Sequence, residues 1–242
     1  MNIDSSLDQI PDDFSLLLKA LGHETRLKIL LLLVNHDSPS LSKLARSLKE
    51  SNSLVLNHLN KLEVAGVVQN FIQKKEGIRE FSFYEVTEYG EKIISDLITG
   101  YNDFFKGLQK KSFIQTTTTQ IPDDLKVALK ALSSKFRFAL TDLMIDSGAL
   151  TFTELLTRTN KKKSTLTHHL KKLELGGLVQ NFLQKSEHTS EYSHYEATDY
   201  GKMMIQSLRG SYNEYYTPLR DQSDETESEM PKKVSGKSQW LS

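Results

Sequence analysis

The sequence predicts a mainly helical protein with small β-hairpins, an α+β chain built from two similar units in tandem. Three observations lead to this prediction: a repeat with a period of 111 residues, helical spacing of apolar residues through most of each unit, and two short strand-like runs late in each unit. About 36 of 96 aligned positions are identical between the units, with no gap needed. Units of this length can each form their own core.

The repeat sets the expected domain boundaries. The segment 10–13 (IPDD) returns as 121–124, and the segment 66–71 (GVVQNF) returns as 177–182 (GLVQNF). Four successive threonines lie between the units, and the end of the chain is rich in Ser, Glu, Asp and Lys. We therefore expect an N-terminal extension over 1–9, a first domain over 10–106, a linker over 107–120, a second domain over 121–217 and a disordered tail over 218–242.

Within a unit, the apolar spacing predicts four helices, a hairpin and a final helix. The third helix has Ser40 as a plausible N-cap, and its counterpart has a capping box formed by Thr151 and Glu154. Two short helices joined by a tight polar turn and followed by a hairpin describe a winged helix-turn-helix. For the first unit we expect helices over about 14–21, 24–34 and 41–48, and a fourth helix from Ser51 or Ser53 to Gly66. Two strands follow, over about 67–74 and 79–86, joined around Glu76-Gly77. A last helix begins at Thr87.

The residues in these elements resemble a known family. The segments 20–30 (ALGHETRLKIL), 41–45 (LSKLA) and 57–68 (NHLNKLEVAGVV) look like an ArsR-type winged-helix regulator, and the resemblance covers about 85 residues of each unit. The second unit is most similar over 164–173 (STLTHHLKKL), and it departs over 133–138 (SSKFRF), where only Arg137 keeps the pattern. The resemblance implies a prokaryotic transcription regulator of the kind that usually forms homodimers through its first and last helices.

Composition narrows the possible chemistry. The 31 basic and 31 acidic residues balance, and the chain has no cysteine. Metal-sensing relatives use cysteines near the third helix or His and Asp on the last helix, but neither last helix here contains a histidine. We therefore expect no metal site and no cofactor. Phosphate-binding loops and nucleophile motifs are missing from the sequence, so an enzyme is not predicted.

Two features of the sequence indicate the cellular compartment of the protein. The N-terminus is acidic and lacks a signal-peptide pattern, and the longest apolar run, Ile29 to Val34, is too short for a membrane span. We therefore expect a cytoplasmic protein with no membrane contact.

The fourth helix of each unit is the predicted recognition helix, which places its polar face in the major groove of double-stranded DNA. From position 161 to 172 there are five lysines and no acid, whereas the matching stretch, 50–61, has one residue of each sign. In the second unit the candidate DNA-binding residues are Lys161, Lys162, Lys163, Ser164, Thr165, Thr167, His168, Lys171 and Lys172. In the first unit they are Ser53, Asn57, Asn60 and Lys61, with Lys74, Lys75 and Arg79 on the wing.

Plainer interpretations of these residues stay open. The lysines could form an ordinary solvated helix face, and the basic wing an ordinary exposed hairpin. Leu54 and Leu56 also face outward in the first unit, where they could serve a protein contact or pack against the turn. His58 and His169 flank the apolar stripe, and we expect half-buried, hydrogen-bonded histidines there rather than metal ligands or base readers.

The sequence therefore predicts a sequence-specific, repressor-like transcription regulator. Its two winged helices would pair within one chain as a pseudo-dimer, and a homodimer of full chains is also compatible. Because the two recognition helices differ, we expect an asymmetric DNA site. The alternative is a protein-protein adaptor of the transcription machinery with little direct DNA binding, using Leu54 and Leu56 as its contact surface.

Overall fold

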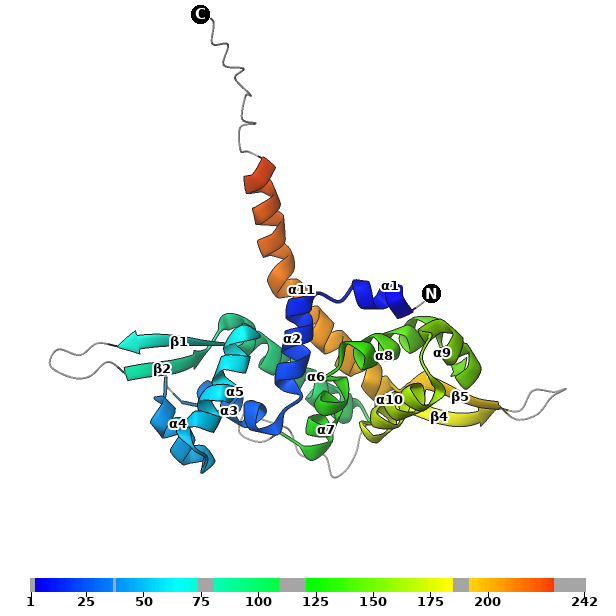
Figure 1. The fold of residues 1–242 in the computed structure, drawn as a ribbon, viewed down its shortest axis with the longest axis horizontal. Helices are drawn as coiled ribbons and strands as arrows, with labels where there is room; N and C mark the ends of the chain where they lie inside the picture. Colours follow the sequence, from blue (N-terminus) through cyan, green and yellow to red (C-terminus); the bar gives the residue numbers. More distant parts are fainter. Residues whose placement is uncertain (1–2, 37, 74–80, 109–120, 185–191, 229–242) are drawn as a thin grey trace, which may run out of the picture.

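The computed structural model describes residues 3–36, 38–73, 81–108, 121–184 and 192–228. Two similar units lie beside each other, and their hairpins point away from each other at opposite ends of the molecule (Figure 1). The first unit contains α2 (Asp12–Leu21), α3 (Glu24–Val34), α4 (Leu41–Leu48), α5 (Asn52–Val64), β1 (Val68–Gln73), β2 (Phe81–Val86) and α6 (Glu88–Gly107).

The second unit repeats this order, which confirms the predicted fold class of two tandem winged helix-turn-helix units. It differs by one short strand, β3, which pairs with β5 so that the sheet order is β3-β5-β4. In the first unit the same place holds a single bridge between Ser40 and Phe83. The elements are α7 (Asp123–Leu132), α8 (Lys135–Ser147), β3 (Leu150–Thr151), α9 (Phe152–Thr159), α10 (Lys163–Leu175), β4 (Val179–Gln184), β5 (Tyr192–Ala197) and α11 (Asp199–Ser228).

Side-chain caps begin the short helices where the sequence predicts them. The Ser40 hydroxyl accepts a hydrogen bond from the backbone N–H of the third residue of α4, and Thr151 and Glu154 form the predicted capping box of α9. Ser51, rather than Ser53, caps α5. Each cap satisfies a backbone N–H that has no partner inside its own helix.

The apolar stripe of each fourth helix forms the centre of its unit. The side chains in the stripe are at most 1% exposed, and burial of each contributes roughly 1.5–3 kcal/mol. Gly66 and Gly177 follow these helices with φ of +72° and +67°, a conformation that glycine adopts without strain. The buried residues are Val55, Leu59 and Leu62 in α5 and Leu166, Leu170 and Leu173 in α10.

A buried arginine holds the turn between the first two helices of each unit. Nε of Arg26 donates to the carbonyl oxygen of Ala20 at 2.8 Å, and Nη2 donates to that of Lys19. Arg137 makes the equivalent bonds at the end of α7. The last carbonyls of a helix have no partner within it, so the guanidinium satisfies them. This need explains why Arg137 keeps the pattern although its neighbours over 133–138 do not.

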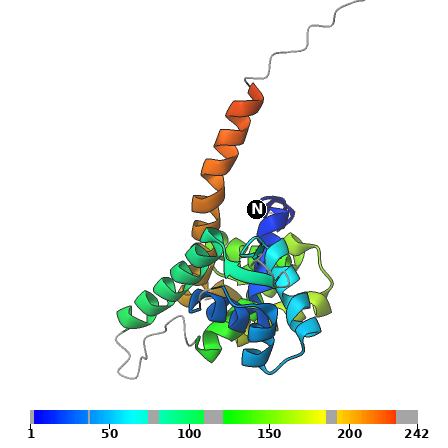
Figure 2. The same ribbon diagram turned by 90° about the vertical axis from the view of Figure 1, so that its left-hand side faces the viewer.

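Both ends of the chain contain helix that the sequence did not predict. Residues of the N-terminal extension form α1 (Ile3–Asp8), which packs against α8 of the second unit. The helix α11 continues through 218–228, so the prediction of disorder is wrong for these residues, and this part projects from the body (Figures 1 and 2). A low apolar content prevents a buried core but not a local helix, because Glu, Gln and Arg favour helices. The linker residues 109–120 and the tail residues 229–242 lie outside the described residues.

The last helices α6 and α11 pack against each other and carry reciprocal hydrogen bonds between the units. The Tyr101 hydroxyl donates to the carboxylate of Asp124 at 2.9 Å. The Tyr212 hydroxyl donates to the carboxylate of Asp13 at 2.7 Å. Tyr101 and Tyr212 are equivalent positions of the repeat, and so are Asp13 and Asp124. Such reciprocity is the property of a twofold interface.

Aromatic contacts follow the same reciprocity. Each of the last helices, α6 and α11, carries three aromatic residues at helical spacing. These three rings surround a tyrosine at the start of the other last helix. These rings make contacts between the units. Tyr89 contacts Tyr212, Tyr215 and Tyr216, and Tyr200 contacts Tyr101, Phe104 and Phe105, with ring centroids 4.8–6.4 Å apart.

Gly22 marks the twofold axis between the units. A methyl group added at Gly22 would lie 2.2 Å from Cβ of Ser133, which is the equivalent position in the repeat. Two equivalent positions can be this close only where the axis passes between them. The ends of α2 and α7 therefore meet at the axis, and a side chain at position 22 would push them apart.

We predict that Tyr212→Phe and Tyr101→Phe each lower the free energy of unfolding by about 1–3 kcal/mol, because each removes a hydrogen bond to a carboxylate across the interface. Urea titration followed by circular dichroism measures the change. Tyr195→Phe, on the second hairpin, is the matched control and should change stability far less. Equal stability of all three variants and the unmodified chain would show that these bonds contribute nothing.

Candidate nucleic-acid interface

A tight turn positions each recognition helix. The short helices α4 and α9 are followed by the C-cap residues Lys49 and Asn160, whose φ angles are +56° and +47°. This left-handed residue reverses the chain, and the next helix begins three residues later in both units. Because one stripe of α5 or α10 is buried in the core, the opposite face is left open to a ligand.

The exposed face of α10 brings together the residues that the sequence singled out. These side chains are exposed along the turn before α10 and along its first two and a half turns, with no acidic residue between them. A face of this composition offers cations for phosphates and hydroxyl or imidazole groups for base edges. The residues are Lys161, Lys162, Lys163, Ser164, Thr165, Thr167, His168, Lys171 and Lys172.

The beginning of α10 is locally unfavourable. Its N-cap residue is Lys162, which makes no side-chain capping bond, and its first turn contains Lys163 and no acid. The equivalent position in α5 is the capping residue Ser51. A missing cap costs roughly 1 kcal/mol, and a cation at the positive end of the helix dipole adds about 0.3–1 kcal/mol. A bound phosphate would reverse both effects, because the free N–H groups and the lysines would then have an anionic partner.

Lys161 has a more specific position than the sequence suggests. Its Nζ lies 5.3 Å from the centroid of the Phe136 ring, a cation-π arrangement, and the Phe136 ring lies 4.6 Å from that of His169. The departure of the second unit from the family pattern over 133–138 thus supplies an aromatic support for the turn before α10.

The exposed face of α5 is uncharged except at its end. Ser53, Asn57, Asn60 and Lys61 are exposed as predicted, and Leu54 and Leu56 are 39% and 38% exposed between them. These exposed fractions leave both uses open, a protein contact and packing against the turn. The wing residues Lys74, Lys75 and Arg79 lie outside the described residues.

Of the two histidines that flank the core stripe, His169 is half-buried as expected, whereas His58 is more deeply buried. His58 is only 5% exposed, and its ring lies 4.6 Å from that of His23. Among the described residues, Nδ1 of His58 and Nδ1 of His169 have no hydrogen-bond partner. Burial lowers the pKa of His58, and burial with the charge of Arg137 lowers the pKa of His169 to about 4. Both rings are therefore neutral at pH 7.

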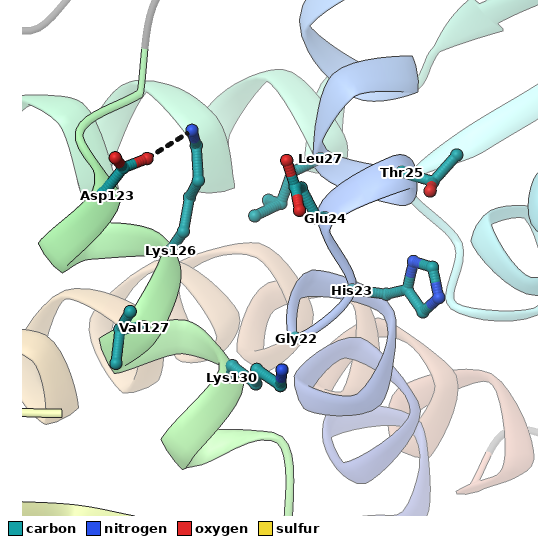
Figure 3. A pocket seen from close by; sticks show the side chains of 9 residues that line it. All are labelled: Gly22, His23, Glu24, Thr25, Leu27, Asp123, Lys126, Val127 and Lys130. Carbon is teal, nitrogen blue, oxygen red and sulfur yellow. Dashed lines mark hydrogen bonds and ion pairs between the residues drawn. The ribbon is translucent and has the colours of Figure 1, made fainter. Parts of the chain in front are cut away.

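A pocket beside the twofold axis contains basic residues that sequence reasoning missed. It has a volume of about 440 Å³ and lies between the α2–α3 turn and α7. In Figure 3 the Lys130 side chain extends from α7 toward the α2–α3 turn, whereas the His23 ring points away from α7. Burial, followed by the charges of Arg26, Lys61 and Lys130, lowers the pKa of His23. The basic residues that lower this pKa belong to α3, to α5 and to α7 of the second unit. The sequence could not show this, because Lys130 is more than 100 positions from His23.

Two further features are absent from the described residues. No group of three or more His, Asp or Glu side chains among them is arranged to hold a metal ion. Within the same ranges, no helix combines the length and the apolar character needed to cross a membrane.

Comparison with known proteins identifies the repeated element. The sequence model of one family, described as "Bacterial regulatory protein, arsR family", matches residues 23–70 and again 134–181. Each match runs from the start of the second helix of a unit into its first hairpin strand, and the two matches are offset by the same period as the internal repeat. A search of curated proteins gave no match.

We predict that stability declines as the pH falls from about 7 towards 4, because the unfolded His169 takes up a proton near pH 6.5 whereas the folded one does so only near 4. Protons then favour the unfolded chain, by about 1–3 kcal/mol across this window. Thermal unfolding measured at several pH values should show a smaller slope for His169→Leu. A residual slope is expected from His23 and His58, whose pKa values are lowered too. An unchanged slope would contradict the assignment.

We predict that Lys162→Ser raises the free energy of unfolding by about 0.5–2 kcal/mol, because it gives α10 the capping hydroxyl that α5 already has. Lys171→Ser is the matched control, since it removes one lysine of the same face from the helix interior and should lower stability slightly. Urea titration distinguishes the two. If both variants are destabilised, the N-terminus of α10 is not strained by its lysines.

Proposed function

Because the chain carries two tandem winged helix-turn-helix domains of the ArsR family and is a DNA-binding transcription regulator, we propose that a single chain reads one asymmetric DNA site as an intramolecular pseudo-dimer. Its two units take the place of the two protomers of a homodimer. The proposed activity is binding of double-stranded DNA, and no catalytic step is assigned to the chain. Binding would be repressor-like, since a regulator that covers its site blocks access to the DNA beneath it.

The reciprocal bonds of Tyr101 and Tyr212 are the observation that carries this proposal. They relate the units by a twofold axis, with Gly22 and Ser133 beside it. A twofold axis relates α5 to α10, and paired recognition helices spaced by about 34 Å enter successive major grooves on one side of a duplex. The two hairpins extend outward at the far ends (Figure 1), as wings flanking such a site would.

Asymmetry of the site follows from the two recognition faces. The α10 face presents lysines around Thr165, Thr167 and His168, and the α5 face presents Asn57, Asn60 and two leucines. Asparagine can pair with adenine edges and leucine can contact a thymine methyl, whereas the lysines contact phosphates or guanine. We therefore propose that the half-site under α10 contributes most of the electrostatic affinity.

We predict that Lys171→Ala with Lys172→Ala weakens DNA binding and lowers the slope of log affinity against log salt by about 1.8, because two phosphate contacts are lost. The matched control is Asn60→Ala with Lys61→Ala at the equivalent positions of α5, where one cation is lost and the slope should fall by about 0.9. Fluorescence anisotropy with a duplex selected from random sequence measures both slopes. Equal effects of the two double variants would contradict the assigned asymmetry.

The adaptor function remains a second candidate, and one observation favours it. Leu54 and Leu56 are both exposed in the first two turns of α5, where a reader of DNA would more often carry polar groups. If the chain is an adaptor, no duplex binds even at low salt, and Leu54→Asn with Leu56→Asn abolishes capture of a protein partner. If it is a DNA reader, the same variant changes the preferred sequence of the α5 half-site and leaves the salt slope unchanged.

A further inference from the structure

We propose that four residues on the last helices make the two units recognise each other and reject a second copy of themselves. They are Asp96 and Gly100 on α6 and Ser207 and Ser211 on α11. The inference rests on the proposed pseudo-dimer and deepens it, because it names the partner that each unit selects. Selection of the unlike unit keeps the two different recognition helices together on one DNA site.

These four residues occupy two pairs of equivalent positions in the repeat, and each pair differs between the units. Asp96 corresponds to Ser207, and Gly100 corresponds to Ser211. Across the twofold axis, position 96 faces position 211, and position 207 faces position 100. The same contact is therefore made twice, once by an Asp–Ser pair and once by a Ser–Gly pair.

The Asp–Ser contact is a hydrogen bond between the units. The Ser211 hydroxyl donates to Oδ2 of Asp96 at 2.7 Å, and Ser211 is 1% exposed. Nζ of Lys92 lies 3.0 Å from the same carboxylate oxygen within α6, and 2.7 Å from a carboxylate oxygen of Glu214 on α11. A hydrogen bond to a charged group is stronger than one between neutral groups. The Asp96 carboxylate is thus matched by a hydroxyl on the opposite helix.

The Ser–Gly contact depends on the lack of a side chain. A Cβ added at Gly100 would lie 2.5 Å from Oγ of Ser207 and 3.3 Å from Sδ of Met203. A side chain at position 100 therefore forces Ser207 or the two helices to shift. Glycine weakens the interior of a helix, so its presence within α6 is explained by this close approach of α11.

Pairing of two like units would lose both contacts. Two first units would place Asp96 of each against Gly100 of the other, so neither carboxylate would receive a hydroxyl from its partner. Two second units would place Ser207 of each against Ser211 of the other, so the overlap at position 100 would arise twice. Only the unlike pair makes the hydrogen bond and leaves room at the other contact. The preference for the correct partner thus comes largely from losses in the wrong pairs.

The connection of the units within one chain favours the correct pair further. A tethered unit acts at an effective concentration of order millimolar, so pairing within the chain is favoured over exchange of units between chains. The tether alone does not remove pairing between like units of two chains at high concentration. The four residues discriminate against that pairing at any concentration.

The test exchanges the four residues between the units of the full chain. The first half exchange, Asp96→Ser with Gly100→Ser, gives both units the residues of the second unit. The second half exchange, Ser207→Asp with Ser211→Gly, gives both units the residues of the first unit. The full exchange combines all four substitutions, and it restores an unlike pair with the two contacts in each other's places. In urea titrations each half exchange should unfold at a lower midpoint, and the full exchange should be more stable than either.

The comparison separates pairing from local effects, because the full exchange contains every substitution of the two half exchanges. Loss of the pair between Lys92 and Asp96, for example, occurs in the first half exchange and again in the full exchange. The folding equilibrium constant of the full exchange should exceed the value expected from independent effects by at least about threefold. Additive effects would overturn the inference. If a half exchange does not fold, the full exchange must still fold for the inference to stand.

The matched control is Ser95→Gln with Gln206→Ser, at equivalent exposed positions of the same two helices. The two single substitutions should have additive effects on stability, because these side chains are exposed on both helices. Coupling as large as that of the full exchange would contradict the assignment of selection to the four interface residues.

A second measurement reports on the placement of the units. The chain has no cysteine, so spin labels at Asn60→Cys and Lys171→Cys measure the distance between α5 and α10. Double electron-electron resonance should give the full exchange the distance distribution of the unexchanged chain, and broader or shifted distributions for the half exchanges. A full exchange as displaced as the half exchanges would contradict the inference. None of these measurements uses DNA, so failure of the inference and failure of DNA binding are distinguishable.

Discussion

The reciprocal hydrogen bonds between the last helix of one unit and the first helix of the other determine how the two recognition helices are placed. Burial and the neighbouring Asp124 carboxylate raise the pKa of Tyr101, so its hydroxyl stays protonated and keeps donating. The equivalent bond from Tyr212 to Asp13 repeats the constraint on the other side of the axis. Because α6 and α11 each follow directly from a hairpin, fixing these helices also fixes the wings and, through the core, α5 and α10.

The tyrosine–aspartate pairs that join the units are identical in both units, whereas most exposed residues of the recognition helices differ. Tyr89 and Tyr200, like the tyrosine–aspartate pairs, are identical because each must satisfy the same interface. The outward positions of α5 and α10 differ, because the core places no demand on them. α10 has lysines at its start in place of a capping residue, which lowers the stability of the helix. An anionic partner would offset this loss of stability. Duplication within one chain thus permits two different recognition helices in one twofold-symmetric arrangement.

Much of each unit could be predicted from sequence, because its signals are local. The spacing of Val55, Leu59 and Leu62 and the capping motif at Thr151 report on residues within one or two turns. Contacts between the units could not be predicted, because they join positions that lie far apart in the chain. The burial of Ile3 on α8 and the effect of the Lys130 charge on the pKa of His23 are of this kind. The helix at 218–228 was missed because composition reports on burial rather than on backbone conformation.

The most direct test of the pseudo-dimer is the stoichiometry of the chain on a duplex selected from random sequence, measured by native mass spectrometry together with a hydroxyl-radical footprint. The account predicts one chain per duplex, a footprint covering two successive major grooves, and a consensus whose two halves differ. Two chains on a palindromic site, with the two units of each chain contributing equally, would contradict it.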